Sequence, residues 1–184
     1  MQRVAGEELL DVLASRELDL DRCAATIADA LVAFVEATEE PYRDLKLDNV
    51  LRAADGTLVF LDVGDPQDAG APAPGDSPYE VSMGNLVASL IFESARPKWL
   101  ARRALHRRSS ELAVLVAGHL RERGAELRAD RLAAAARRDY VRSTFGRRSP
   151  ARTAWYATVG SVAGTRVPLP GEAVGPVSLR AARP

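Results

Sequence analysis

The sequence predicts a mostly α-helical fold that contains one small β-hairpin, which is an α+β arrangement. Apolar residues recur at helical spacing before residue 40 and again after residue 79, and the period changes between these segments. The chain has 184 residues, of which 47% are hydrophobic and 27% charged. That composition is typical of a soluble globular protein, and the length suffices for one domain with a sizeable core.

Two helices are predicted before the hairpin. A cluster of apolar residues predicts a short helix over about 6–15, and apolar residues three and four apart predict a longer one over about 22–38. Asp19 or Asp21 can cap the longer helix, because a carboxylate accepts hydrogen bonds from the free N–H groups of the first turn.

The predicted hairpin lies in the middle of the chain. Residues 49–52 and 57–62 are expected to be strands, because they flank Asp55-Gly56, a dipeptide typical of hairpin turns. Residues 64–78 are rich in Gly, Pro and Ala, which predicts an irregular loop.

Helices are again predicted after this loop. Residues 79–95 are apolar enough for a largely buried helix, and two or three Arg-, Ala- and Leu-rich helices follow over about 98–107, 109–124 and 127–143. From about residue 147 the chain is punctuated by Pro and Gly, which indicates a partly irregular extension.

Several classes of protein are excluded by composition. No run of 18 apolar residues predicts a membrane span, and the N-terminus does not have the pattern of a secretory signal, so a cytoplasmic protein without a membrane partner is expected. The single cysteine, Cys23, rules out an internal disulfide and is expected to pack in or near the core. His106 and His119 are 13 residues apart and show no metal-binding spacing.

The net charge of zero conceals an asymmetry. Residues 1–95 carry 19 acids and 6 bases (net −13), whereas residues 96–184 carry 6 acids and 19 bases (net +13). Two complementary faces of one fold would explain this pattern, and so would a basic surface for an acidic partner such as a leader peptide. The basic half has few aromatic residues, which argues against nucleic acid as a partner.

One segment carries a pattern typical of catalysis. Residues 42–51 read Y-R-D-L-K-L-D-N-V-L, and residues 61–64 read L-D-V-G. They resemble the catalytic loop (H-R-D-L-x-x-x-N) and the metal-binding turn (D-F-G) of the protein-kinase-like superfamily, which includes the aminoglycoside phosphotransferases. Tyr in the first position is similar to the protein kinase A and C group. Asp44 precedes Asn49 by five residues and Asn49 precedes Asp62 by 13, which are the spacings of that family.

The resemblance implies a role for each matching residue. Asp44 would be the catalytic base and Lys46 a contact to the transferring phosphate, since phosphoryl transfer depends on positioning and charge neutralisation. Asn49 and Asp62 would hold Mg²⁺, which prefers oxygen ligands, and together with Lys46 they would bind ATP. The structural residues of the site would be Tyr42, Arg43 and Gly64.

The resemblance covers the large lobe of such a kinase, without the N-terminal β-rich lobe. It implies a lobe over 1–146 and an extension over 147–184; within the lobe lie a catalytic loop (42–51), a metal turn (62–64), an activation-like loop (64–78) and a central helix (79–95). Tyr79 stands where the family has the central-helix Asp that braces the catalytic loop. Neither a G-x-G-x-x-G loop nor a V-A-I-K lysine precedes Tyr42, so a small lobe or partner protein is expected in trans.

Three functions remain open from the sequence. The first is an ATP- and Mg²⁺-dependent phosphotransferase that modifies a hydroxyl of a Ser or Thr side chain, in a protein or peptide, or of a small-molecule alcohol. The second is a non-catalytic, kinase-like binding or scaffold subunit of a complex. The third is a truncated fragment of a full-length kinase.

Overall fold

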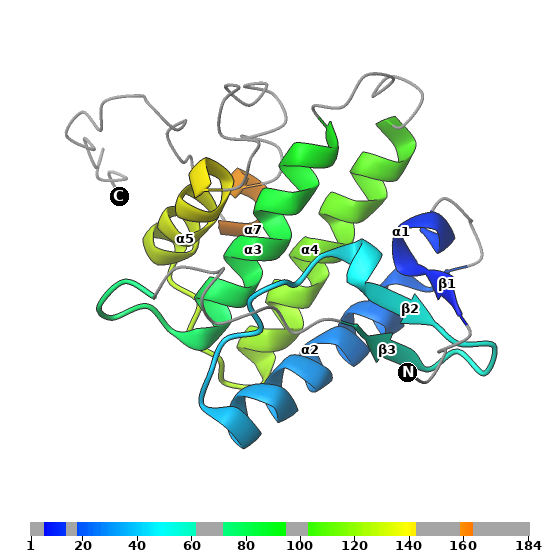
Figure 1. Cartoon of the computed structure of the whole chain (residues 1–184), viewed down its shortest axis with the longest axis horizontal. Helices are drawn as coiled ribbons and strands as arrows, with labels where there is room; N and C mark the ends of the chain where they lie inside the picture. The colour runs from blue at the N-terminus through cyan, green and yellow to red at the C-terminus, as the bar shows by residue number, and fades with distance from the viewer. Residues whose placement is uncertain (1–5, 14–17, 62–71, 95–102, 143–158, 164–184) are drawn as a thin grey trace, which may run out of the picture.

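Helices make up most of the structure, and a small antiparallel sheet lies at one side of them (Figure 1). This computed structural model describes residues 6–13, 18–61, 72–94, 103–142 and 159–163. Its elements are β1 (Glu7–Glu8), α1 (Leu9–Val12), α2 (Leu20–Thr38), the 3₁₀ helix η1 (Leu47–Asn49), β2 (Val50–Arg52), β3 (Leu58–Phe60), α3 (Pro78–Ser94), α4 (Arg103–Glu122), α5 (Ala129–Arg142) and α7 (Ser161–Ala163). The predicted mostly α fold with a small β element is confirmed.

Helix α2 begins at a carboxylate cap. The Asp19 side chain accepts a hydrogen bond from the Arg22 N–H at 3.1 Å, so Asp19, of the two candidates, is the cap. The helix ends where Glu39 adopts a left-handed conformation (φ 58°) and its N–H bonds to the Val35 carbonyl. The helix predicted over 22–38 is therefore confirmed, with two more residues at its start.

The sheet has the strand order β1-β2-β3, with antiparallel pairing throughout. The β2–β3 hairpin turns at Gly56, whose φ of 86° suits glycine and whose N–H bonds to the Ala53 carbonyl. The predicted hairpin is thus confirmed. The helix expected over 6–15 is only partly correct, because Glu7 and Glu8 pair with β2 as a strand and only Leu9–Val12 is helical among residues 6–13.

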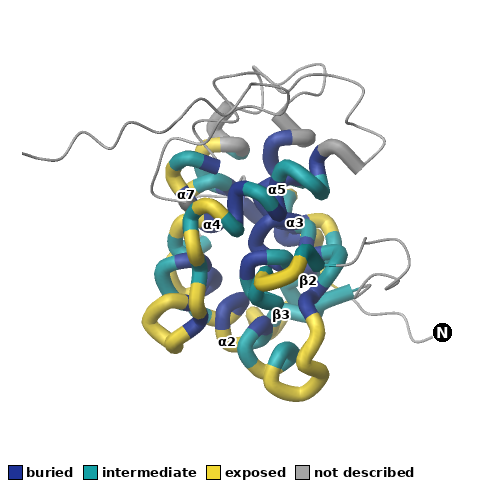
Figure 2. The backbone as a smooth tube through the Cα atoms, turned by 90° about the vertical axis from the view of Figure 1, so that its left-hand side faces the viewer, coloured by how far each residue is buried: buried dark blue, intermediate teal, exposed yellow. Residues whose placement is uncertain are grey.

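Helix α3 is the centre of the core and packs against both α4 and α5 (Figure 1). Its apolar residues from Met83 to Ile91 are almost completely buried, which agrees with the predicted buried helix over 79–95. Figure 2 shows this buried backbone running through the middle of the molecule, with exposed segments at the periphery.

Helix α4 packs on α2 and is a single helix. The sequence predicts two or three helices over about 98–107, 109–124 and 127–143, and the described residues 103–142 form two, α4 and α5. A break near residue 108 is wrong, because neither Gly nor Pro interrupts the helical pattern around Arg108. Later in the chain, Val159 and Val162 are buried, and the Arg121 guanidinium donates to the Val162 carbonyl at 3.2 Å. No helix in the described residues is long and apolar enough to cross a membrane.

Candidate functional site

The loop that carries the kinase-like pattern connects α2 to β2. Its apolar side chains, at Leu45, Leu47 and Val50, are buried in the core. Asp44 and Lys46, which alternate with them, are partly exposed, with side-chain exposures of 24% and 38%. The alternation of apolar and polar residues therefore anchors the loop while its charged side chains stay accessible to solvent.

Two side chains of this loop, Lys46 and Asn49, converge on the Asp44 carboxylate. The Lys46 ammonium lies 2.5 Å from Asp44 Oδ1, and the Asn49 amide donates to Asp44 Oδ2 at 2.7 Å. The same amide also donates to the Asp44 backbone carbonyl at 3.1 Å. Both contacts fix the orientation of Asn49, because only its NH₂ group can donate. The Asn49 oxygen is therefore turned away from Asp44, and it is the atom of this side chain suited to a cation.

Tyr42 ties the start of the loop to the core and to the hairpin. Its N–H donates to the Ser82 hydroxyl at 2.9 Å, and its own hydroxyl donates to the Leu61 carbonyl at 2.6 Å. Tyr42 is 3% exposed, and its ring contacts the rings of Phe34 and Phe60, with centroids 5.4 and 5.8 Å apart. These contacts fix the start of the loop against α3 and the end of β3.

Arg43 lies next to Tyr42 and is largely buried, with 11% of its side chain exposed. Its guanidinium donates to the Glu40 carboxylate at 2.7 Å. Glu40 itself is 60% exposed, so this ion pair lies at the edge of the site and contributes little to stability.

The predicted metal turn, residues 62–64 with Asp62 and Gly64, lies outside the described residues. Leu61, which precedes Asp62, donates its N–H to the Asn49 carbonyl at 2.8 Å. The hairpin therefore brings the chain back to Asn49 at the residue before Asp62. Within the described part of the chain, no three His, Cys, Asp or Glu side chains form a group that could hold a metal ion.

Ser82 is a contact of the site that the sequence did not reveal. The kinase-like alignment draws attention to Tyr79, which occupies the place of the family's bracing Asp. In the structure the acceptor for the loop N–H is Ser82, three residues further along α3. Burial raises the pKa of the Tyr79 hydroxyl, and the Glu36 carboxylate adds to that effect.

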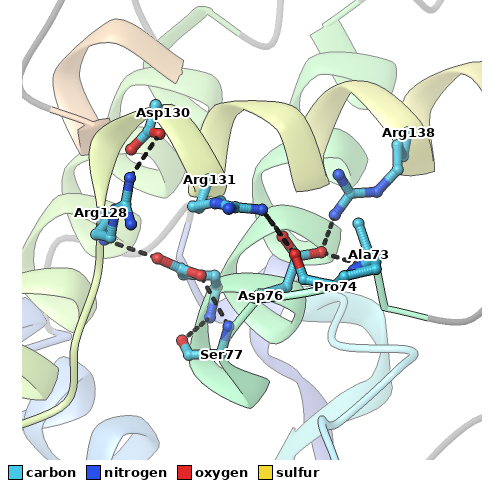
Figure 3. Close-up of polar contacts among 9 residues, drawn as sticks. Ala73, Pro74, Asp76, Ser77, Arg128, Asp130, Arg131 and Arg138 are labelled. Carbon is cyan, nitrogen blue, oxygen red and sulfur yellow. Dashed lines mark hydrogen bonds and ion pairs between the residues drawn. The ribbon is translucent and has the colours of Figure 1, made fainter.

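The start of α3 is fixed by a reciprocal cap (Figure 3). The Ser77 hydroxyl accepts from the Glu80 N–H at 3.1 Å, and the Glu80 carboxylate accepts from the Ser77 N–H at 2.8 Å. Glu80 is 1% exposed, and its second oxygen accepts from the Arg128 N–H at 2.8 Å. The S-x-x-E pattern is a signal for this cap that sequence analysis could have used.

Asp76 holds the end of the predicted activation-like loop against α5 (Figure 3). Its side chain is fully buried and pairs with Arg138 and, at 3.7 Å, with Arg131. The same carboxylate accepts from the Ala73 N–H at 2.9 Å. Residues 72–77, the described end of that loop, are therefore fixed by paired charge where they enter α3.

The remaining candidates from the sequence show no catalytic arrangement in the described structure. Cys23 is buried, and burial raises the pKa of its thiol to about 11, so it is protonated at neutral pH. His119 lies 3.0 Å from Asp21 and 2.9 Å from Glu122, and these hydrogen bonds, chiefly the one to Asp21, raise the pKa of its imidazole. His106 lies in α4.

No protein-family model, curated protein or solved structure matches this chain. What the loop can do chemically follows from its side chains. The partly buried Asp44 carboxylate contacts the Lys46 ammonium and the Asn49 amide. The end of the hairpin approaches the same loop, because the Leu61 N–H bonds to the Asn49 carbonyl. Such a carboxylate can orient or accept a proton, and the ammonium beside it can contact an anionic group.

Proposed function

We propose that this chain is the large lobe of an ATP- and Mg²⁺-dependent phosphotransferase. It would transfer the γ-phosphoryl group to the hydroxyl of a Ser or Thr side chain or of a small-molecule alcohol. The observation that carries the proposal is the convergence of Lys46 and Asn49 on Asp44 within one loop. The order and spacing of these residues are those of the kinase-like catalytic loop.

Each residue then has a defined task. Asp44 orients the acceptor hydroxyl and takes its proton as the hydroxyl oxygen bonds to the γ-phosphorus and the bond to the bridging oxygen of ADP breaks. Lys46 lies beside the carboxylate and contacts the transferring phosphoryl group. The Lys46 ammonium offsets the negative charge of the phosphoryl group, which would otherwise repel the Asp44 carboxylate.

The donor set fits Mg²⁺. Asn49 offers an amide oxygen, since its NH₂ group is used by Asp44, and Asp62, next after Leu61 in sequence, offers carboxylate oxygens. When bound, the ion would neutralise phosphate charge. The glycine-rich loop and lysine of a small lobe are not in the 184 residues. We propose that another protein segment supplies them and that the isolated chain binds ATP weakly.

The test is calorimetric titration of ATP into the chain, with and without Mg²⁺. We expect Mg²⁺-dependent binding that weakens at least tenfold in Asp62→Asn and in Asn49→Ala. Asp48→Asn is the matched control, because Asp48 is an exposed carboxylate in the same loop that makes none of these contacts. Equal loss in the control would refute a specific metal site.

A second variant tests the chemistry separately from binding. Asp44→Asn should keep Mg²⁺-dependent ATP binding and abolish transfer to a hydroxyl once a small lobe is supplied. If the wild-type chain binds Mg²⁺-ATP but the complete assembly transfers nothing, the non-catalytic binding role is correct. If the chain does not bind Mg²⁺-ATP even with its partner, the kinase-like assignment of the site fails.

A further inference from the structure

We infer that Ser82 is a positioning residue for the candidate site, because its hydroxyl holds the start of the catalytic-type loop against the central helix. This inference rests on the proposed function. Ser82 lies on α3 and is fully buried. Its hydroxyl donates to the Pro78 carbonyl at 2.9 Å and accepts from the Tyr42 N–H at 2.9 Å.

The direction of both hydrogen bonds is determined. A serine hydroxyl has one proton, and Pro78 offers only an acceptor, so that proton points back along the helix. A lone pair of the Ser82 oxygen therefore faces the Tyr42 N–H. The backbone N–H of Tyr42 is buried, and a buried N–H without an acceptor is costly.

Tyr42 passes this constraint to both parts of the site. Asp44 follows Tyr42 by two residues in the loop. The Tyr42 hydroxyl donates to the Leu61 carbonyl at 2.6 Å. Leu61 is the residue before Asp62. Tyr42 therefore connects α3, the carboxylate loop and the end of the hairpin, and Ser82 is a polar contact that it makes on α3.

The position of the acceptor also accounts for the departure from the kinase pattern. Tyr79 stands where the family has its bracing Asp, and Ser82 lies three residues later. Residues three apart share one face of a helix, so the acceptor is displaced by nearly one turn along the same face of α3. The Tyr42 N–H therefore has a hydroxyl as its acceptor on α3, where the family has a carboxylate.

The test compares two serines of α3. Ser82→Ala removes the acceptor for Tyr42, whereas Ser89→Ala removes a hydroxyl that donates only to the Leu86 carbonyl, at 2.7 Å, within the same helix. Amide hydrogen exchange at Tyr42 is measured by NMR and normalised to amides of α3 itself. The affinity for Mg²⁺-ATP is measured by calorimetry on the same variants, with the full chain.

We expect exchange at Tyr42 to be at least tenfold faster in Ser82→Ala, and the affinity for Mg²⁺-ATP to be at least fivefold weaker. Ser89→Ala should change neither. If Ser82→Ala does not fold, Ser82→Cys replaces it, because sulfur preserves the volume and is a poor acceptor; the same changes are expected.

Two results would overturn the inference. One is unchanged exchange at Tyr42, and the other is faster exchange with unaltered affinity, which would give Ser82 a structural role only. Both results differ from failure of the proposed function. That failure would appear as absence of Mg²⁺-dependent ATP binding by the wild-type chain with its partner.

Discussion

Replacing Gly84 by Ala tests a close approach in the core, where α3 packs against α5. A β-carbon at Gly84 would lie 2.7 Å from Ala135 Cβ and 2.8 Å from the Ala136 nitrogen. Ordinary carbon contacts are about 3.5–4.0 Å, so the overlap is about 1 Å. These neighbouring atoms cannot rotate away, because they belong to the backbone of α5 or are bonded directly to it. The helices themselves must separate.

Two opposing effects set the magnitude. Overpacking a core costs about 1–3 kcal/mol, whereas Ala in place of Gly in a helix gains about 1 kcal/mol. Because the overlap falls on backbone, we take the upper part of the first range and expect a net loss of about 1–2 kcal/mol. For a chain of this length that lowers Tm by about 2–8 °C.

Urea denaturation followed by circular dichroism measures this loss, and Gly118 supplies the control. Gly118 lies within α4, and a β-carbon there would meet nothing within 4 Å. Gly118→Ala should therefore raise the free energy of unfolding by up to about 1 kcal/mol. The two substitutions are chemically identical and should have opposite signs. A Gly84→Ala variant as stable as Gly118→Ala would refute the close crossing of α3 and α5.

Two further predictions follow from the ionisable groups. The pKa of the Cys23 thiol is about 11, and the thiolate is the form that reacts with a maleimide. At pH 7.5 the thiol should therefore react at least about 100-fold more slowly in the native chain than in urea. Equal rates would show that the side chain is accessible. The pKa of His119 is raised, chiefly by its hydrogen bond to Asp21, so its stabilising contribution is complete below pH about 6.5 and is lost as pH rises through the folded-state value. His119→Gln should therefore cost more stability at pH 5.5 than at pH 9 in urea titrations, and equal costs at the two values would contradict the contact.

The elements with local signals were predictable from the sequence. The Asp19 cap and the Asp55-Gly56 turn depend on residues within three or four positions of each other, and both are where the sequence places them. Strand β1 was missed because two glutamates carry no apolar alternation. It pairs with β2 directly after Gly6, where a β-carbon would lie 3.0 Å from the Arg52 carbonyl oxygen, so the glycine suits this close approach.

In the candidate site, too, the contacts between neighbours in sequence were predictable and the long-range contact was not. The convergence of Lys46 and Asn49 on Asp44 is local, so the loop pattern alone indicates which side chains can meet. The contact from Tyr42 to Ser82 spans 40 residues and depends on how α3 lies against the loop. No local pattern specifies that contact, and the family alignment points instead to Tyr79.

The charge asymmetry of the chain is in part a property of how its two halves pack together. Acids of the first half contact bases of the second: Asp21 with His119, Asp29 with Arg123, and Asp76 with Arg131 and Arg138. The exposed pairs contribute little energy individually, but Asp76 is fully buried and needs its arginines. Part of the positive charge after residue 95 is therefore neutralised within the fold. A basic half does not by itself imply an acidic partner, because four of its bases (His119, Arg123, Arg131 and Arg138) already pair with acids of the first half.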